Sequence, residues 1–163
     1  MLSLRWFAPA ACAASLTIFL LWWLVLYRAL KPGAYEFEPA GRSFEPTLTR
    51  YFEIARVLIS LAVGSVALLA GYVGYVLHAK PQSLAIIQRV VAWPLLLLAF
   101  SVIYAVLFLA SLARSYERYQ HFPDSYTRFW YSLNQALAFA ALTCFASGYL
   151  VLALSVVSMV IEG

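Results

Sequence analysis

Glu117, His121 and Asp124 are the residues of this chain that come closest to a metal-binding pattern. Glu117 and His121 are four residues apart, so both side chains would lie on one face of a helix. A structural zinc site needs four converging ligands, and here the third would have to come from a turn. We therefore favour an ion pair of the acidic groups with Arg114 or Arg118 at a membrane surface, and we expect no metal.

Other patterns that predict catalysis or cofactor binding are weak. Cys12 and Cys144 are far apart and lack redox spacing, so we expect two buried free thiols. The sequence has no Gly-rich phosphate loop, nucleophile elbow or metalloprotease helix. We expect no cofactor and no catalytic residues, and we lean against an enzyme.

A stripe of small residues is the most regular pattern in the chain. Its members are spaced by four, three, four and three residues, and His78 follows four residues after the last: Ser60, Gly64, Ala67, Gly71 and Gly74. Small side chains let two helices approach closely in lipid. The pattern predicts a helix-packing interface, for which we favour packing inside the protein over a partner helix or a ligand groove.

The elements that carry these residues follow from hydropathy. The 163 residues are 64% hydrophobic and 11% charged, and mean hydropathy is +0.84. Soluble domains are nearer 45–50% apolar and about 25% charged. All eighteen Asp, Glu, Lys and Arg side chains lie outside four apolar runs, at residues 7–27, 57–77, 90–113 and 133–161. Each run is long enough to cross a membrane as a helix.

We therefore predict an all-α fold, an integral-membrane four-helix antiparallel bundle that forms a single transmembrane domain over residues 1–163. The first run is too long for a signal peptide, and Trp22, Trp23 and Tyr27 look like interfacial anchors. We expect the fourth helix to pack against the second. Because the centres of the spans hold no ionisable group, proton relays and ion-coupled carriers are disfavoured.

The basic residues predict an orientation. Eight of the eleven fall in the first and third connections, at positions 28, 31, 42, 50, 56, 114, 118 and 128. Cytoplasmic loops of membrane proteins carry an excess of Lys and Arg, so these connections are predicted to be cytoplasmic and both termini extracytoplasmic. A cell membrane or bacterial inner membrane is favoured, and the net charge of +4 is explained without nucleic acid.

A polar site is predicted at the cytoplasmic ends of the third and fourth helices. Asn134 and Gln135 open the fourth run and could line a polar vestibule, although solvation at the interface explains them equally well. The charged residues near them are Arg114, Glu117, Arg118, His121 and Asp124.

Three functions remain open. The leading hypothesis is a non-catalytic accessory or scaffold subunit of a membrane complex, whose partners are lipids and either other subunits or copies of itself. The second is an uncharged pore or a carrier for a lipid or small apolar solute, with a path between protomers lined by Pro94, Asn134, Gln135, Tyr72, Tyr75 and Tyr104. The third is an interfacial enzyme on a lipophilic substrate, with a site among Arg42, Glu53, Arg56, Arg114, Glu117, Arg118, His121 and Asp124.

Overall fold

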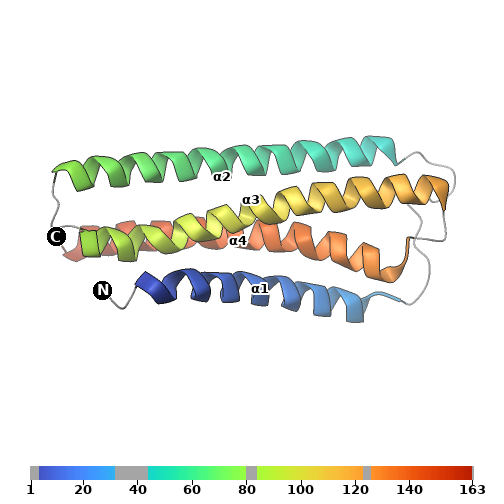
Figure 1. Cartoon of the computed structure of the whole chain (residues 1–163), viewed down its shortest axis with the longest axis horizontal. Coiled ribbons are helices and arrows are strands. Elements are labelled where there is room, and N and C mark those ends of the chain that lie inside the picture. Colours follow the sequence, from blue (N-terminus) through green and yellow to red (C-terminus); the bar gives the residue numbers. More distant parts are fainter. Residues whose placement is uncertain (1–3, 32–43, 80–83, 123–125, 163) are drawn as a thin grey trace.

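The computed structural model describes residues 4–31, 44–79, 84–122 and 126–162. Within these ranges the chain forms four helices and no strand, which confirms the predicted all-α class. The helices are α1 (Leu4–Ala29), α2 (Glu45–Ala79), α3 (Leu84–His121) and α4 (Arg128–Glu162). Successive helices run in opposite directions along one long axis (Figure 1).

All four helices are long and apolar enough to cross a membrane, with candidate spans at Pro9–Ala29, Glu45–Tyr75, Val91–His121 and Arg128–Leu154. They overlap the four apolar runs of the sequence. At 1.5 Å per residue, the 38 residues of α3 extend for about 57 Å, compared with about 30 Å of hydrocarbon. The helix extends beyond both ends of the apolar run, and residues 114–121 at its end carry charged residues of the predicted polar site.

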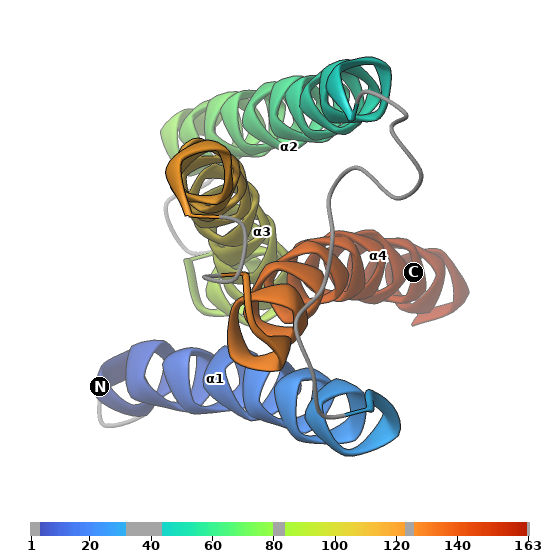
Figure 2. The same cartoon turned by 90° about the vertical axis from the view of Figure 1, so that its right-hand side faces the viewer.

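The helix order across the bundle differs from the prediction that α4 packs on α2. The most extensive contact joins α3 to α4, while α2 packs on α3 and α1 packs mainly on α4. Figure 2 shows the pair α3–α4 in the middle, with α1 and α2 on opposite sides of it. The predicted packing of α4 on α2 is therefore wrong as a main contact: a hydrogen bond between the hydroxyls of Ser65 and Tyr149 joins the two helices, while Ala141 and Gly148 of α4 pack against α3.

The α3–α4 contact is close because small side chains meet there. Ser101 and Ala105 of α3 and Ala141 of α4 are at most 3% exposed. The Ser101 hydroxyl donates a hydrogen bond of 2.9 Å to the carbonyl oxygen of Ala141. A Cβ atom on Gly148 would lie 3.1 Å from Cγ of Leu98, so glycine permits this approach of the two helices.

Aromatic side chains join α1 to α4. The Trp22 ring stacks on Phe139 at a centroid distance of 4.7 Å, and its indole N–H donates to Oγ1 of Thr143 at 3.0 Å. One turn further along α1, the guanidinium carbon of Arg128 lies 4.1 Å from the centre of the Tyr27 ring. These aromatic residues, interpreted as interfacial anchors from the sequence, thus also form a helix contact.

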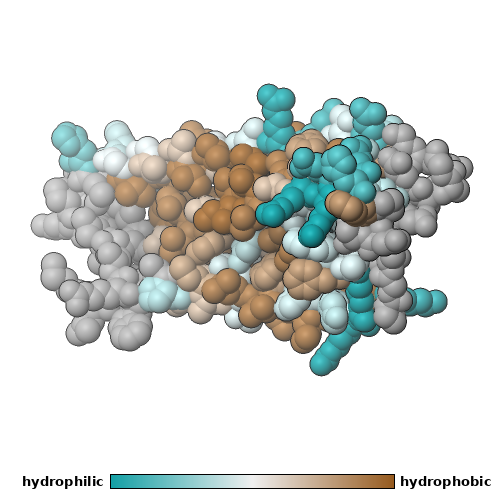
Figure 3. Space-filling model, turned by 45° about the vertical axis from the view of Figure 1, so that its right-hand side comes forward, coloured by the Kyte–Doolittle hydropathy of each residue, from teal (hydrophilic) through white to brown (hydrophobic). Residues whose placement is uncertain are grey.

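The surface is divided along the long axis. Apolar side chains form a band across the middle of the face in Figure 3, and hydrophilic side chains gather at the end where α2 and α4 begin. The exposed arginines Arg50, Arg56, Arg114 and Arg118 belong to this end.

Buried thiols were predicted at both cysteines, but Cys12 is exposed and Cys144 alone is buried; both are free. Cys12 is exposed although its neighbour Ala11 is fully buried.

Candidate functional site

A buried amide lies near the start of α4, where α3 comes to its end. Asn134 is 3% exposed. Its Oδ1 accepts a hydrogen bond of 2.6 Å from the hydroxyl of Ser111, and its Nδ2 donates to the hydroxyl oxygens of Ser115 at 3.3 Å and Tyr126 at 3.5 Å. The side chain therefore links two helices and the segment that joins them. Sequence reasoning identified Asn134 but not Ser111, Ser115 or Tyr126 as its partners.

Burial also changes the chemistry of Tyr126, which is 4% exposed. Desolvation raises the pKa of its phenol to about 12, although the hydrogen bond from Asn134 lowers this pKa in part. The phenol consequently keeps its proton at neutral pH and acts as a neutral hydrogen-bonding group. Tyr126 lies in an aromatic-rich segment, and the sequence of this segment contains no signal that sets its buried tyrosine apart from the exposed aromatic residues near it.

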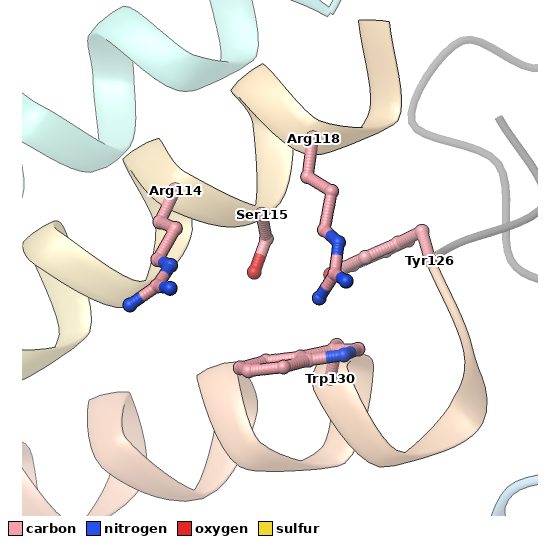
Figure 4. Close-up of a pocket in the computed structure, with 5 residues that line it drawn as sticks. All are labelled: Arg114, Ser115, Arg118, Tyr126 and Trp130. Carbon is pink, nitrogen blue, oxygen red and sulfur yellow. The ribbon is translucent and has the colours of Figure 1, made fainter. Parts of the chain in front are cut away.

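Two arginines approach an indole ring beside this buried amide. The pocket, which we call the arginine–tryptophan pocket, is lined by Arg114, Ser115, Arg118, Tyr126 and Trp130. Figure 4 shows the side chains of Arg114 and Arg118 extending from α3 toward α4, with Arg118 above Trp130, Arg114 to one side of that ring and the Ser115 hydroxyl between the two arginines. The pocket is small, with a volume of about 10 Å³, which is room for about one water molecule.

The structure brings together only part of the predicted polar site. Arg114 and Arg118 line the arginine–tryptophan pocket, and Asn134 donates to two of the hydroxyls in its wall. Glu117 and His121 are exposed and do not line it, while Asp124 lies outside the described residues. Over the part of the chain that the structure describes, no three His, Cys, Asp or Glu side chains are grouped as they would be around a metal.

Gln135 belongs to a different feature, although it is adjacent to Asn134 in the sequence. It lines a groove of about 210 Å³ between α2 and α4, whose floor is formed by Ala105 and Phe108 of α3. The remaining walls are mostly apolar: Tyr51, Ile54, Ala55, Leu58, Ala138, Phe139, Ala141 and Leu142. We call this feature the α2–α4 groove, and a polar vestibule shared by Asn134 and Gln135 is not formed.

The small-residue stripe of α2 lies on the outside of the described bundle. Its five members, Ser60, Gly64, Ala67, Gly71 and Gly74, are all exposed. A Cβ atom built on any of the three glycines would meet nothing within 4 Å. At 100° per residue the stripe lies about half a turn around α2 from the residues buried toward α3, which are Ala55, Leu58 and Ala62. Among the described residues, this stripe therefore does not pack against another helix of the same chain.

The residues proposed to line a pore are dispersed. Tyr72 and Tyr75 are exposed on α2, whereas Pro94 and Tyr104 are buried within α3. Asn134 and Gln135 face different surroundings, as described above. A path through one copy of the chain is not formed by these side chains.

Comparison with known proteins adds no assignment: no family model, no curated protein and no solved structure matches this chain.

Proposed function

We propose that this protein is an integral membrane protein and a non-catalytic subunit of a membrane complex, which binds a helix of another subunit along the stripe on α2. The observation that carries the proposal is the exposure of Gly64, Gly71 and Gly74, on the face of α2 that points away from α3.

Small exposed residues on a membrane helix favour this function for a physical reason. Lipid chains are as apolar as leucine, so helices associate in a bilayer through close packing and hydrogen bonds rather than through the hydrophobic effect. Glycines along one face permit the backbone of a partner to come close, and Ser60 adds a hydroxyl that can hydrogen-bond to it. The four spans also lack the central ionisable groups on which proton relays and ion-coupled carriers depend.

The test uses one substitution at two exposed alanines. Ala67→Leu places a larger side chain on the stripe, and Ala110→Leu makes the same enlargement at an exposed side chain of α3. After extraction in mild detergent, native gels and mass spectrometry should show unrelated subunits that travel with wild type and with Ala110→Leu and are lost from Ala67→Leu. Isolation of wild type as copies of the 18.2 kDa chain alone would contradict the proposal of a complex subunit.

The proposed orientation places both termini outside the cytoplasm. It rests on the basic residues: among the described residues, Arg28, Arg50, Arg56, Arg114, Arg118 and Arg128 belong to the helix segments at the end of the bundle where α2 begins. A reporter fused after residue 163 should be active only outside the cytoplasm. Activity confined to the cytoplasm would reverse the orientation and leave the helix count unchanged.

The α2–α4 groove favours a second candidate function, the binding of a lipid chain by a carrier. Its walls are hydrocarbon side chains apart from the amide of Gln135 and the phenol of Tyr51, and they lie within the candidate spans, where the surrounding medium would be acyl chain. A photoreactive phosphatidylcholine with a diazirine near the middle of one chain should label residues 54–58 and 138–142. Ala138→Phe, which fills the groove, should reduce this labelling selectively, and uniform labelling of all exposed faces would argue against a carrier.

A further inference from the structure

The α2–α4 groove has a polar end and an apolar end. Helices α2 and α4 run in the same direction (Figure 1), so Tyr51 and Gln135, the first lining residues on each helix, lie at the same end of the groove. The other end is formed by Leu58 and Leu142, the last lining residues of the two helices. A ligand that matches this groove is therefore apolar along its length and polar beside Tyr51 and Gln135.

Gln135 supplies a hydrogen-bond donor at the polar end. The wall opposite is held in place, because the ring of Tyr51 packs edge-on against Phe108 at a centroid distance of 6.0 Å. Within the parts of the chain that the structure describes, the Gln135 amide has no hydrogen-bond partner. An amide that faces hydrocarbon loses the hydrogen bonds that water would provide. A ligand oxygen that accepts from Nε2 of Gln135 would restore one of them.

The groove is too short for a helix that spans a membrane. Its lining extends from Tyr51 to Leu58 and from Gln135 to Leu142, about 10 Å at 1.5 Å per residue. Further along both helices, a hydrogen bond between the hydroxyls of Ser65 and Tyr149 joins α2 to α4. A partner helix that crosses about 30 Å of hydrocarbon would have to pass over this hydrogen bond.

The volume of the groove also indicates a part of a molecule rather than a whole one. At about 210 Å³ it is below the roughly 300–1,000 Å³ of pockets that enclose a complete small-molecule ligand. A single hydrocarbon chain is narrow, flexible and apolar, so it fits the length, the volume and the lining of the groove. The rest of such a molecule would lie outside the groove, beyond the end formed by Tyr51 and Gln135.

We propose that the α2–α4 groove binds one acyl chain of an ester-linked phospholipid, whose ester carbonyl oxygen accepts a hydrogen bond from the Gln135 amide. The ester groups of a bilayer lipid lie between its headgroup and its hydrocarbon. Gln135 lies at the matching level, because it is close to the start of the apolar run at residue 133 and follows the charged Arg128 that begins α4. The proposal rests on the second candidate function, lipid-chain binding, and specifies the class of lipid and the direction of its chain.

The binding experiment compares two phospholipids that differ only in this carbonyl group. The probes are dioleoylphosphatidylcholine and its diether analogue, in which a methylene group replaces each ester carbonyl. Equal amounts are mixed with the purified full chain in neutral detergent, and native mass spectrometry measures the ratio that is bound. Wild type should retain the diester about fivefold more than the diether, as expected for one hydrogen bond. Equal retention of the two lipids by wild type would overturn the proposal.

Two glutamine variants assign the preference to one side chain. Gln135→Leu removes the donor and keeps a side chain of similar length in the groove, so the ratio should fall to about one. Gln120→Leu makes the same change at an exposed glutamine of α3, and the ratio should stay at about fivefold. A preference that survives Gln135→Leu, or that Gln120→Leu abolishes as well, would overturn the contact with Gln135.

Photolabelling separates failure of this contact from failure of the carrier function. The diazirine lipid should label residues 54–58 and 138–142 in the purified chain and in native membranes. If these residues are labelled while the diester and the diether are retained equally, the ester contact is refuted and the lipid-chain site remains. Absence of labelling in both preparations would refute the carrier function too. Labelling of the purified chain alone would overturn the proposal in favour of a helix of another protein, or of a second copy, as the occupant.

Discussion

The hydroxyl of Ser111 on α3 donates a hydrogen bond of 2.6 Å to Oδ1 of Asn134 on α4. This hydrogen bond satisfies the amide oxygen, while the amide nitrogen donates to Ser115 and Tyr126. A buried polar group destabilises a pair of helices when it has no hydrogen-bond partner, and it links the two helices when it is hydrogen-bonded across them. This amide therefore fixes the register between α3 and α4 at the end of the bundle where the arginine–tryptophan pocket lies.

Replacing this amide should weaken the protein. Asn134→Ala removes the hydrogen bonds that this amide makes with Ser111, Ser115 and Tyr126, and we expect it to lower the free energy of unfolding by about 1–3 kcal/mol. Gln135→Ala is the matched control, because Gln135 is the adjacent amide and lines the α2–α4 groove instead. Unfolding titrations in mixed detergent micelles measure both variants, and an equal loss at the two positions would contradict the role of Asn134.

Tyr126 should make the protein sensitive to strong alkali. Burial raises the pKa of its phenol from 10.0 to about 12, so the folded state favours the protonated form. This contribution to stability is fully present below pH 10 and is lost as the pH rises from about 10 to about 12, because the unfolded chain releases the proton first. Tyr126→Phe should flatten the alkaline decline in stability, which is followed by circular dichroism between pH 9 and pH 12.

The control for this titration is Tyr75→Phe, which removes a phenol that is 75% exposed. Its alkaline profile should match that of wild type. A profile of Tyr126→Phe that also matches wild type would show that the Tyr126 phenol titrates at its ordinary pKa in the folded protein.

Trp22 and Trp23 form a natural pair for measuring the hydrogen bond between α1 and α4. The Trp22 indole donates to Thr143, whereas the buried Nε1 of Trp23 has no hydrogen-bond partner among the described residues. Both changes to phenylalanine remove the same ring volume, and we expect Trp22→Phe to cost about 0.5–1.5 kcal/mol more than Trp23→Phe. Thermal unfolding in detergent is the measurement.

A double variant isolates the contact. In a Thr143→Val background, Trp22→Phe should cost no more than Trp23→Phe, because the acceptor is already absent. If the difference between the two tryptophans persists in that background, ring stacking on Phe139 rather than the hydrogen bond is responsible.

Hydropathy was sufficient for the four helices, because eighteen charges are excluded from four long apolar runs. It was not sufficient for the order of the helices. Small residues on α2 and on α4 both permit close packing, and local sequence contains nothing that pairs one stripe with another. Ala140 and Cys144 of α4 became buried, while Gly64 and Gly71 of α2 stayed exposed.

The polar site shows the same limit at the level of single residues. Asn134 and Gln135 are neighbours with the same functional group, yet a rotation of about 100° around α4 directs one to Ser111 and the other to the α2–α4 groove. Helix periodicity separates their directions but does not state which neighbour each will meet. Arg114 and Arg118 could be paired from their spacing, whereas Trp130 reaches them only through the α3–α4 contact.

Glycines on α2 and α4 should respond oppositely to the same added methyl group. On Gly148 a Cβ atom would lie 3.1 Å from Cγ and 3.3 Å from Cδ2 of Leu98, which is fully buried, so Leu98 or the helices around it would have to shift by a few tenths of an ångström. We expect Gly148→Ala to destabilise the protein by about 1–3 kcal/mol through overpacking. Gly71→Ala meets nothing within 4 Å and should leave stability unchanged or raise it, because alanine favours helix over glycine by up to about 1 kcal/mol.

Two measurements separate the roles of these glycines. Unfolding of the purified chain measures the change in stability, and native gels measure the retention of partner subunits. Under the proposed function Gly71→Ala weakens that retention while Gly148→Ala preserves it in the folded fraction, since only Gly71 lies on the outer stripe. Loss of stability in purified Gly71→Ala equal to that in Gly148→Ala would mean that the stripe is packed within the protein after all.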